Sequence, residues 1–318
     1  MSDSIQFVIH LRGKQNGGHR MPAGISLHKS LTGIPSLFGP VPENAALSIT
    51  NEYKDLRWPK SDIRMKLVGT EMDRKHILKF LEKFGFTTGV KLERVNNAPR
   101  KHIEDRIKKI VGSRPPLLVI HFQGHGIRLG DTVQYITEDH KEDGELEGLT
   151  GKELIKMFST LTTDTTSLVI TDFCNSGNLY RLRFQLVIGT DGPSWHETTE
   201  WENDDKCHPA FRITSPMLHI AGSLDCQQVY ETRARGGYFT NSLAHLEAKP
   251  RTLPQFLLDT RRGVDGHIVA TKAKFDPSAR SMFQDPQVFS SDMWPLDDPQ
   301  ILSKIRLGTA RLNLSVSS

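Results

Sequence analysis

Two stretches of the chain decide the fold: LLVIHFQGHG at residues 117–126 and SLVITDFCNSG at residues 167–177. Each begins with a short, almost wholly apolar run, which is typical of a strand covered on both faces of a sheet. Each run ends in a polar turn that contains glycine, and these turns carry His125 and Cys174. Ligands bind beyond the carboxyl ends of parallel strands. If the two strands are neighbours, His125 and Cys174 lie side by side at that edge of the sheet.

This placement suits thiol catalysis. The thiol of Cys174 becomes a strong nucleophile only after it loses its proton, and the imidazole of His125 can take that proton and return it to a leaving amine. Attack on an amide creates an oxyanion, which needs preorganised N–H donors. We expect the backbone amides of Gly126 and Cys174 to be these donors, because glycine beside His125 allows the tight turn that presents the first of them.

Outside these two stretches, short apolar runs alternate with segments of helical periodicity. Further strands are expected at residues 45–49, 86–93 and 217–221. Helices are expected at residues 71–84, 99–111, 154–161 and 239–247. This alternation predicts an α/β fold with a mostly parallel central sheet and helices on both faces. Residues 178–216 interrupt the pattern, and we expect a long loop there, which is either functional or disordered.

The composition bounds the class of protein. The 318 residues include 37% apolar and 25% charged ones, with a formal net charge of +4, which is ordinary for a soluble globular protein. Basic and acidic residues are interleaved, so we expect no nucleic-acid partner. No run reaches the roughly 18 apolar residues of a membrane span, and no secretory signal is present, so we expect no membrane partner. The three cysteines favour a reducing compartment, the cytoplasm or also the nucleus.

Simpler interpretations of the two central residues stay open at this point. A lone buried cysteine is usually part of a core, and a histidine at a strand end is usually structural. A metal site built from Cys174, Cys207, His208 and Cys226 lacks the CxxC or HxxxH spacing typical of zinc sites. A plain α/β binding domain would require the two strand ends to lie apart. The combination of both motifs favours catalysis.

The interval and the motifs together resemble a known family. Cys174 follows His125 by 49 residues, and caspases show an interval of about 50 with the histidine first. HFQGHG resembles the H-Y-S-G-H-G of metacaspases, and DFCNSG resembles their D-C-C-H-S-G. Further segments resemble the family in the same order, at residues 45–53, 67–73, 220–227, 237–240 and 284–287.

The resemblance implies a three-layer caspase-like α/β fold and a cysteine endopeptidase of the caspase and metacaspase type (peptidase family C14, clan CD). Such an enzyme acts in proteolysis, with regulated cell death as one setting. The resemblance suggests a peptidase domain at residues 44–292. Residues 1–43 are expected to form a loosely ordered extension with at most one short strand, Phe7–Leu11, and residues 293–318 a C-terminal tail. The sequence does not indicate the oligomeric state.

The resemblance also implies a preference for Arg or Lys before the cleaved bond. Asp73 and Asp172 match the family's acidic pocket residues, and Gln123 and Ser223 lie in segments that match its substrate groove. A buried carboxylate that pairs with a cation gives far more selectivity than a charge at the rim. The expected partners are therefore proteins or peptides with basic residues. A simpler role for Asp73 is an acid that complements the dipole at a helix N-terminus.

Some positions depart from the family pattern. Asn175 replaces the histidine after the nucleophile, Gln123 replaces a serine, and Thr70 replaces a cysteine. An alternative function follows from these departures. The chain would then be a catalytically weak caspase-like scaffold that serves as a protein-interaction module.

The resemblance also raises the question of calcium. Asp139 and Asp143 lie in the acidic stretch 131–147 and are candidate ligands, because calcium prefers carboxylate oxygens. A further acid normally follows the nucleophile motif, but residues 178–181 read NLYR. We therefore expect no required cofactor and weak or absent calcium dependence, and a solvated acidic loop is the simpler interpretation.

Many enzymes of this type cut themselves in the loop after the nucleophile-bearing strand. Here RLRFQLVI at residues 181–188 resembles a strand, and a strand cannot easily enter an active site. Lys206 follows the acidic stretch EWENDD, which has no strand pattern. An exposed segment of this kind is a preferred site of proteolysis, so the expected first cut falls after Lys206, with Arg212 as the alternative.

Overall fold

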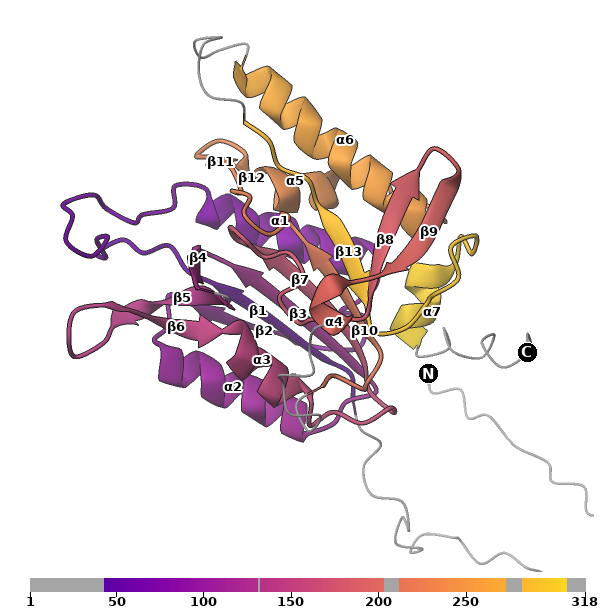
Figure 1. Cartoon of the computed structure of the whole chain (residues 1–318), viewed down its shortest axis with the longest axis horizontal. Coiled ribbons are helices and arrows are strands. Elements are labelled where there is room, and N and C mark those ends of the chain that lie inside the picture. Colours follow the sequence, from indigo (N-terminus) through magenta and orange to yellow (C-terminus); the bar gives the residue numbers. More distant parts are fainter. Residues whose placement is uncertain (1–42, 131, 203–211, 273–281, 308–318) are drawn as a thin grey trace, which may run out of the picture. The chain divides into compact units, whose positions relative to one another are not determined.

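The computed structural model describes residues 43–130, 132–202, 212–272 and 282–307. Its centre is an eight-stranded sheet with the order β2-β1-β3-β7-β10-β13-β8-β9 (Figure 1). Five neighbouring strands run parallel: β2 (Leu92–Asn96), β1 (Ala45–Thr50), β3 (Leu117–Gln123), β7 (Thr166–Asp172) and β10 (Met217–Ala221). Three strands extend the sheet by antiparallel pairing: β13 (Gln287–Ser290), β8 (Phe184–Gly189) and β9 (Gly192–Glu197).

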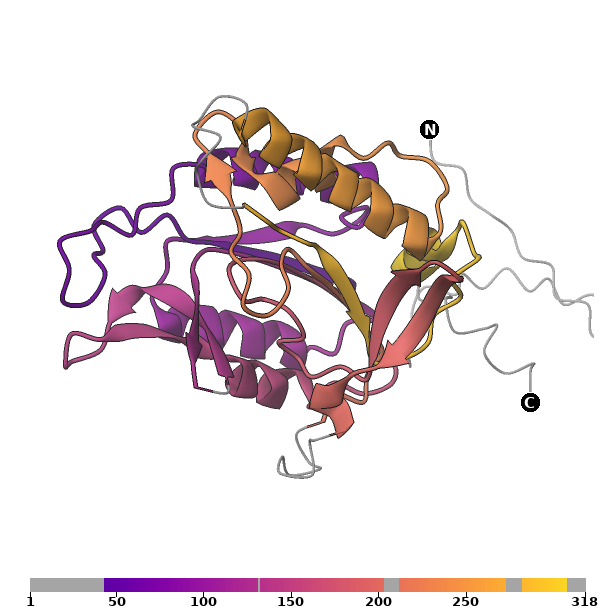
Figure 2. The ribbon, with the colours of Figure 1, turned by 45° about the horizontal axis from the view of Figure 1, so that its top comes forward.

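Helices cover both faces of this sheet (Figure 2). One face carries α1 (Thr70–Lys83), α5 (Tyr238–His245), α6 (Leu253–Lys272) and α7 (Ile301–Leu307). The other face carries α2 (Arg100–Gly112) and α3 (Gly151–Phe158). The predicted three-layer α/β architecture with a mostly parallel sheet is therefore confirmed.

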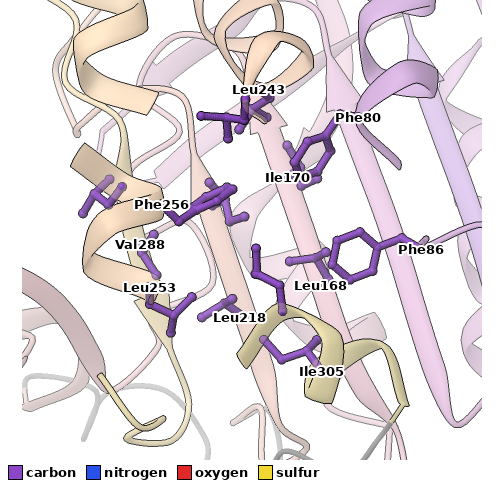
Figure 3. Close-up of a cluster of buried hydrophobic side chains, with 14 of the residues drawn as sticks. Phe80, Phe86, Leu168, Ile170, Leu218, Leu243, Leu253, Phe256, Val288 and Ile305 are labelled. Carbon is purple, nitrogen blue, oxygen red and sulfur yellow. The ribbon is translucent and has the colours of Figure 1, made fainter. Parts of the chain in front are cut away.

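The sheet separates two hydrophobic cores because successive side chains of a strand point to opposite faces. On β7, Leu168 and Ile170 face the layer of α1, α5 and α6, whereas Val169 faces α2 and α3. Figure 3 shows the first core, where Phe80 of α1 and Phe256 of α6 lie with ring centroids 6.3 Å apart. Close packing on both faces holds the strands in place, and so it fixes the positions of the strand ends that carry His125 and Cys174.

A smaller antiparallel sheet follows β3 directly. It consists of β4 (Gly126–Leu129), β5 (Thr132–His140) and β6 (Leu146–Thr150). Most of the stretch expected as an acidic loop is therefore strand, because Tyr135 and Ile136 are fully buried and anchor β5. Since β4 begins at Gly126, this sheet holds the chain immediately after His125.

Two expected elements differ from the structure. Strand β2 begins at Leu92 and not at residue 86, because Gly85 and Gly89 both have a φ of +73° and turn the chain there. Residues 178–216 were expected as a loop with one strand-like segment at residues 181–188; they contain the hairpin β8–β9, whose first strand overlaps that segment, and the short helix α4 (Thr199–Glu202). Only one face of β8 is buried, and such a short alternating pattern is weak in sequence.

The remaining expectations concern the two ends of the chain and the self-cleavage site. The predicted N-terminal extension with its strand Phe7–Leu11 lies outside the described residues except for Glu43, and Lys206 also lies outside them. Of the predicted C-terminal tail, residues 293–307 are described, and Trp294 and Ile305 are buried in the core shared with α1 and α6. No helix in the described ranges is long and apolar enough to cross a membrane.

Candidate active site

The strands β3 and β7 pair in parallel, with Gln123 opposite Asp172. His125 and Cys174 each follow two residues later, so both lie at the same edge of the sheet. Both line one pocket of about 490 Å³. The two turns are also joined directly, because Asn175 Nδ2 donates to the carbonyl oxygen of Gly126 over 3.3 Å. The structure thus brings the predicted pair together in one pocket.

The imidazole of His125 is held from three sides. Its Nε2 lies 2.6 Å from the carbonyl oxygen of Met65, and its backbone N–H donates to the hydroxyl of Tyr53 over 2.9 Å. The rings of Tyr53 and Trp58 pack against it, with centroids 4.8 and 5.1 Å away. Because a carbonyl oxygen can only accept, Nε2 carries the proton and Nδ1 carries the lone pair. The ring is therefore set up to accept a proton at Nδ1.

Burial keeps both members of the pair neutral in the free protein. It lowers the pKa of His125, although the hydrogen bond to Met65 opposes this change. It also raises the pKa of Cys174, although the backbone N–H of Val229 donates to the sulfur over 3.4 Å. The negative charge of Asp172 raises the pKa of Cys174 further. The resting pair is thus a thiol beside a neutral imidazole, and the proton has to move as a substrate is attacked.

Gly126 passes very close to the nucleophile turn. A β-carbon at Gly126 would lie 2.1 Å from the carbonyl oxygen of Cys174 and 2.5 Å from the ring of Phe173. Only glycine fits here, because these distances are far below ordinary contacts. The close approach places the two residues predicted to hold an oxyanion next to each other, and the role of their amides stays a prediction.

Two buried carboxylates lie in the same pocket as the pair. Asp73, in the first turn of α1, accepts the backbone N–H of Gly237 over 2.7 Å. Asp172, at the end of β7, accepts the hydroxyl of Thr240 over 2.5 Å. Burial, together with the charge of Asp172, raises the pKa of Asp73 well above its usual range. Burial raises the pKa of Asp172 to about 6.

A third acid in this pocket, Glu231, was missed by sequence reasoning. It lies on β11 (Glu231–Thr232), which pairs with β12 (Gly236–Gly237). Its two oxygens accept the backbone N–H groups of Val68 and Gly69 over 2.5 and 3.1 Å, and burial raises its pKa. Within the described ranges, none of Asp73, Asp172 and Glu231 forms an ion pair. The pocket therefore groups three acids that form no ion pair there, and Arg128, which also lines it, pairs instead with Asp225.

The other two predicted substrate residues have different surroundings. Gln123 lines the pocket, and its Nε2 donates to the hydroxyl of Thr70 over 3.2 Å. Ser223 is fully buried beneath the nucleophile turn, where its hydroxyl lies 3.3 Å from both the carbonyl oxygen of Phe173 and the hydroxyl of Ser176. Ser223 is therefore placed to support the turn and not to touch a substrate.

The candidate calcium ligands lie away from this pocket. Asp139 accepts the backbone N–H of Arg100 over 3.0 Å, at the start of α2, and Asp143 accepts the backbone N–H of Glu145 in the β5–β6 turn. In the part of the chain that the structure describes, no group of three or more His, Cys, Asp or Glu side chains is placed to hold a metal ion. Of the alternative metal residues, Cys207 and His208 lie outside the described ranges.

The fold and the pocket agree with the comparison with known families. A family model of the caspase domain, peptidase family C14, matches residues 43–293. The chain therefore belongs to the caspase-domain family, a family of cysteine peptidases.

Two solved structures are similar to the chain at low identity. Protein GSU0716 from Geobacter sulfurreducens is 18% identical, with a TM-score of 0.51 over 82% of this chain and 97% of that chain. Caspase-1 from Spodoptera frugiperda is 15% identical, with a TM-score of 0.48 over 78% of this chain and 86% of that chain. At such identity, the first likeness concerns the fold alone. No curated protein matches the chain significantly.

Proposed function

We propose that the protein is a cysteine endopeptidase that cleaves after Arg or Lys, with Cys174 as the nucleophile. His125 takes the thiol proton at Nδ1, because Nε2 already donates to Met65. It then gives the proton to the leaving amine, and water releases the acyl group from Cys174. The backbone amides of Gly126 and Cys174 hold the oxyanion during both attacks.

The observation that carries the proposal is the group of acids Asp73, Asp172 and Glu231 in the pocket that contains Cys174. Their raised pKa values reflect the free energy that the folded protein spends on burying negative charge. An arginine or lysine side chain in the pocket would neutralise that charge, whereas an aspartate side chain would add to it. The substrates are therefore proteins or peptides with basic residues before the cleaved bond.

A panel of fluorogenic peptides that differ only in the residue before the cleaved bond tests the proposal. We expect Arg and Lys peptides to be cleaved about 100-fold or more faster than the Asp peptide. The Cys174→Ala variant should bind but not cleave, because the change removes the nucleophile and little volume. Equal cleavage of the Asp peptide would contradict the pocket assignment. The reaction needs no cofactor, so rates in EDTA and in millimolar calcium should agree closely.

The alternative is a catalytically weak scaffold, and two observations favour it. Asn175 stands where the family motif has histidine, and the pKa of Cys174 is raised by burial. A thiol-reactive probe with an arginine recognition group distinguishes the two functions. Labelling of Cys174 that an arginyl peptide blocks supports the peptidase, and no labelling of folded protein supports the scaffold.

A further inference from the structure

A second cavity, of about 660 Å³, is lined by residues of α1, α5 and α6. These three helices pack together on one face of the sheet (Figure 2). Three histidines and two arginines contribute to its wall: His76, His245, His267, Arg235 and Arg262. We call it the histidine cavity. It shares no lining residue with the catalytic pocket, so its chemistry needs a separate explanation.

His76 is the first sign that this cavity binds a ligand. The residue is only 7% exposed, and its Nδ1 has no hydrogen-bond partner in the described part of the chain. Its ring meets the ring of His245 edge-on, with centroids 5.8 Å apart. A buried polar nitrogen without a partner costs about 1–3 kcal/mol of stability. Because His76 lines the cavity, a ligand that turns this nitrogen toward the cavity and bonds to it would recover that free energy.

The balance of charge in the wall is the second sign. Asp259, the acid in the wall, pairs with two arginines, Arg251 over 2.8 Å and Arg262 over 3.1 Å. Arg235 instead donates to Nδ1 of His267 over 3.3 Å and forms no ion pair within the described ranges. The pKa of His76 is lowered to about 4, first by burial and then by positive neighbours that include His245 and His267. The wall thus has an excess of positive charge.

We propose that the histidine cavity binds a small phosphate-bearing anion, held by Arg235 and His267. A guanidinium presents paired N–H donors that match the oxygens of phosphate. His267 adds a donor at Nε2, because its Nδ1 accepts from Arg235. The cavity is much larger than a phosphate group needs, and Met72 and Leu246 contribute apolar surface. The ligand therefore has an organic body that packs against these two residues.

The position of the cavity makes this anion an effector of the catalytic pocket. Met72 lines the histidine cavity, and the next residue, Asp73, lines the catalytic pocket. In the same way, Arg235 lines the cavity and Gly237, two residues on, lines the pocket and donates to Asp73. A ligand that moves Arg235 therefore also moves the β11–β12 hairpin, which carries Glu231 and bonds to Asp73 through Gly237. This effector role rests on the proposed peptidase function, whereas the binding does not.

Binding is measured by calorimetry on the full chain carrying Cys174→Ala, at constant ionic strength, with inorganic phosphate, pyrophosphate and citrate. We expect saturable binding of phosphate and pyrophosphate. Arg235→Gln should weaken it about tenfold or more, because it removes a cavity charge that forms no ion pair within the described ranges. The matched control is Arg233→Gln, an exposed residue of the same hairpin turn that does not line the cavity, and it should bind as the parent does.

A second variant blocks the cavity without changing its charge. Gly266 lines the cavity, and a β-carbon there would meet no atom within 4 Å, so a leucine side chain fits at the cavity wall, and leucine favours the helix more than glycine does. Gly266→Leu should abolish anion binding and leave the protein folded. The proposal would be overturned if the parent showed no saturable binding. It would also be overturned if Arg235→Gln and Gly266→Leu both bound the anions as tightly as the parent does. Binding of citrate but not of the phosphates would overturn the assignment to phosphate.

The effector role has its own readout. Pyrophosphate should change kcat/KM for an arginyl peptide about threefold or more in the wild type and not in Arg235→Gln. An unchanged kcat/KM with intact binding would overturn the effector role alone. If no peptide is cleaved at all, the calorimetry still decides whether the site exists.

Discussion

The carboxylate of Asp73 accepts the backbone N–H of Gly237 over 2.7 Å. This bond ties the first turn of α1 to the β11–β12 hairpin, although the two residues lie 164 positions apart in the chain. The same hairpin brings Glu231 to the backbone N–H groups of Val68 and Gly69. The acidic wall of the catalytic pocket is therefore one hydrogen-bonded unit.

Asp73→Asn tests the cost of the buried charge. Asparagine keeps the acceptor for Gly237 but removes the charge, so kcat/KM for an arginyl peptide should fall about 10- to 100-fold. The folded pKa of Asp73 is raised, so its contribution to stability is fully present below about pH 3.8 and is lost progressively as the pH rises toward the folded pKa. The variant should therefore unfold at a higher temperature than the wild type at pH 8. Asp105→Asn, at an exposed site on α2, is the control, and a less stable Asp73→Asn would contradict the repulsion argument.

The pH dependence of activity should depend on the substrate. Because the pKa of Asp172 is about 6, its carboxyl loses charge as the pH falls through 6, and kcat/KM for an arginyl peptide should fall about tenfold per pH unit at most. Burial lowers the pKa of His125 from 6.5, but a change in rate caused by the histidine would appear with every substrate. A peptide with glutamine before the cleaved bond should lack the fall caused by Asp172. The same acid limb with both peptides would assign it to another group.

Gly126→Ala tests the close approach to the nucleophile turn. The new methyl group would collide with the carbonyl of Cys174, so the turn must move, and activity should fall about 100-fold or more. Circular dichroism should show that the sheet and helices persist. Gly112→Ala, at the end of α2 where a β-carbon meets no atom within 4 Å, is the matched control and should keep full activity. Wild-type activity in Gly126→Ala would show that the turn is not constrained.

Acid should unfold the protein through buried histidines. Burial lowers the pKa of His219, on β10, from 6.5 to about 3, and its Nε2 lies 2.8 Å from the hydroxyl of Thr171. The unfolded chain takes up this proton near pH 6.5, so stability is fully present above that pH and is lost as the pH falls. At pH 5 the loss is about 2 kcal/mol for this residue.

Urea unfolding of His219→Gln at pH 7.5 and pH 5 measures this contribution. The difference in unfolding free energy between the two pH values should shrink by about 2 kcal/mol relative to the wild type. His102→Gln, at an exposed site on α2, should leave the difference unchanged. An unchanged difference in His219→Gln would show that His219 is not the group that titrates.

Local sequence patterns predicted the central strands of the fold and the position of the catalytic pair. A strand that is covered on both faces must be apolar throughout, so residues 117–122 and 167–171 predicted β3 and β7 directly. His125 and Cys174 follow these strands in glycine-bearing turns, and parallel strands end at one edge of a sheet. Residues 181–188 also suggested a strand, which the structure has as β8, but its partner β9 was missed, because an edge strand with so little buried surface leaves only a weak pattern.

The sequence by itself determined the order of strands and helices, and the two residues most suited to thiol chemistry. Only the tertiary structure decided what surrounds them. Met65 acts on His125 through its backbone carbonyl, which every residue possesses, so no side-chain signal could identify it. Glu231 belongs to the site because packing buries it in the same pocket as Asp73 and Asp172. Desolvation and charge repulsion depend on burial and distance, and both arise only when segments far apart in the chain pack together.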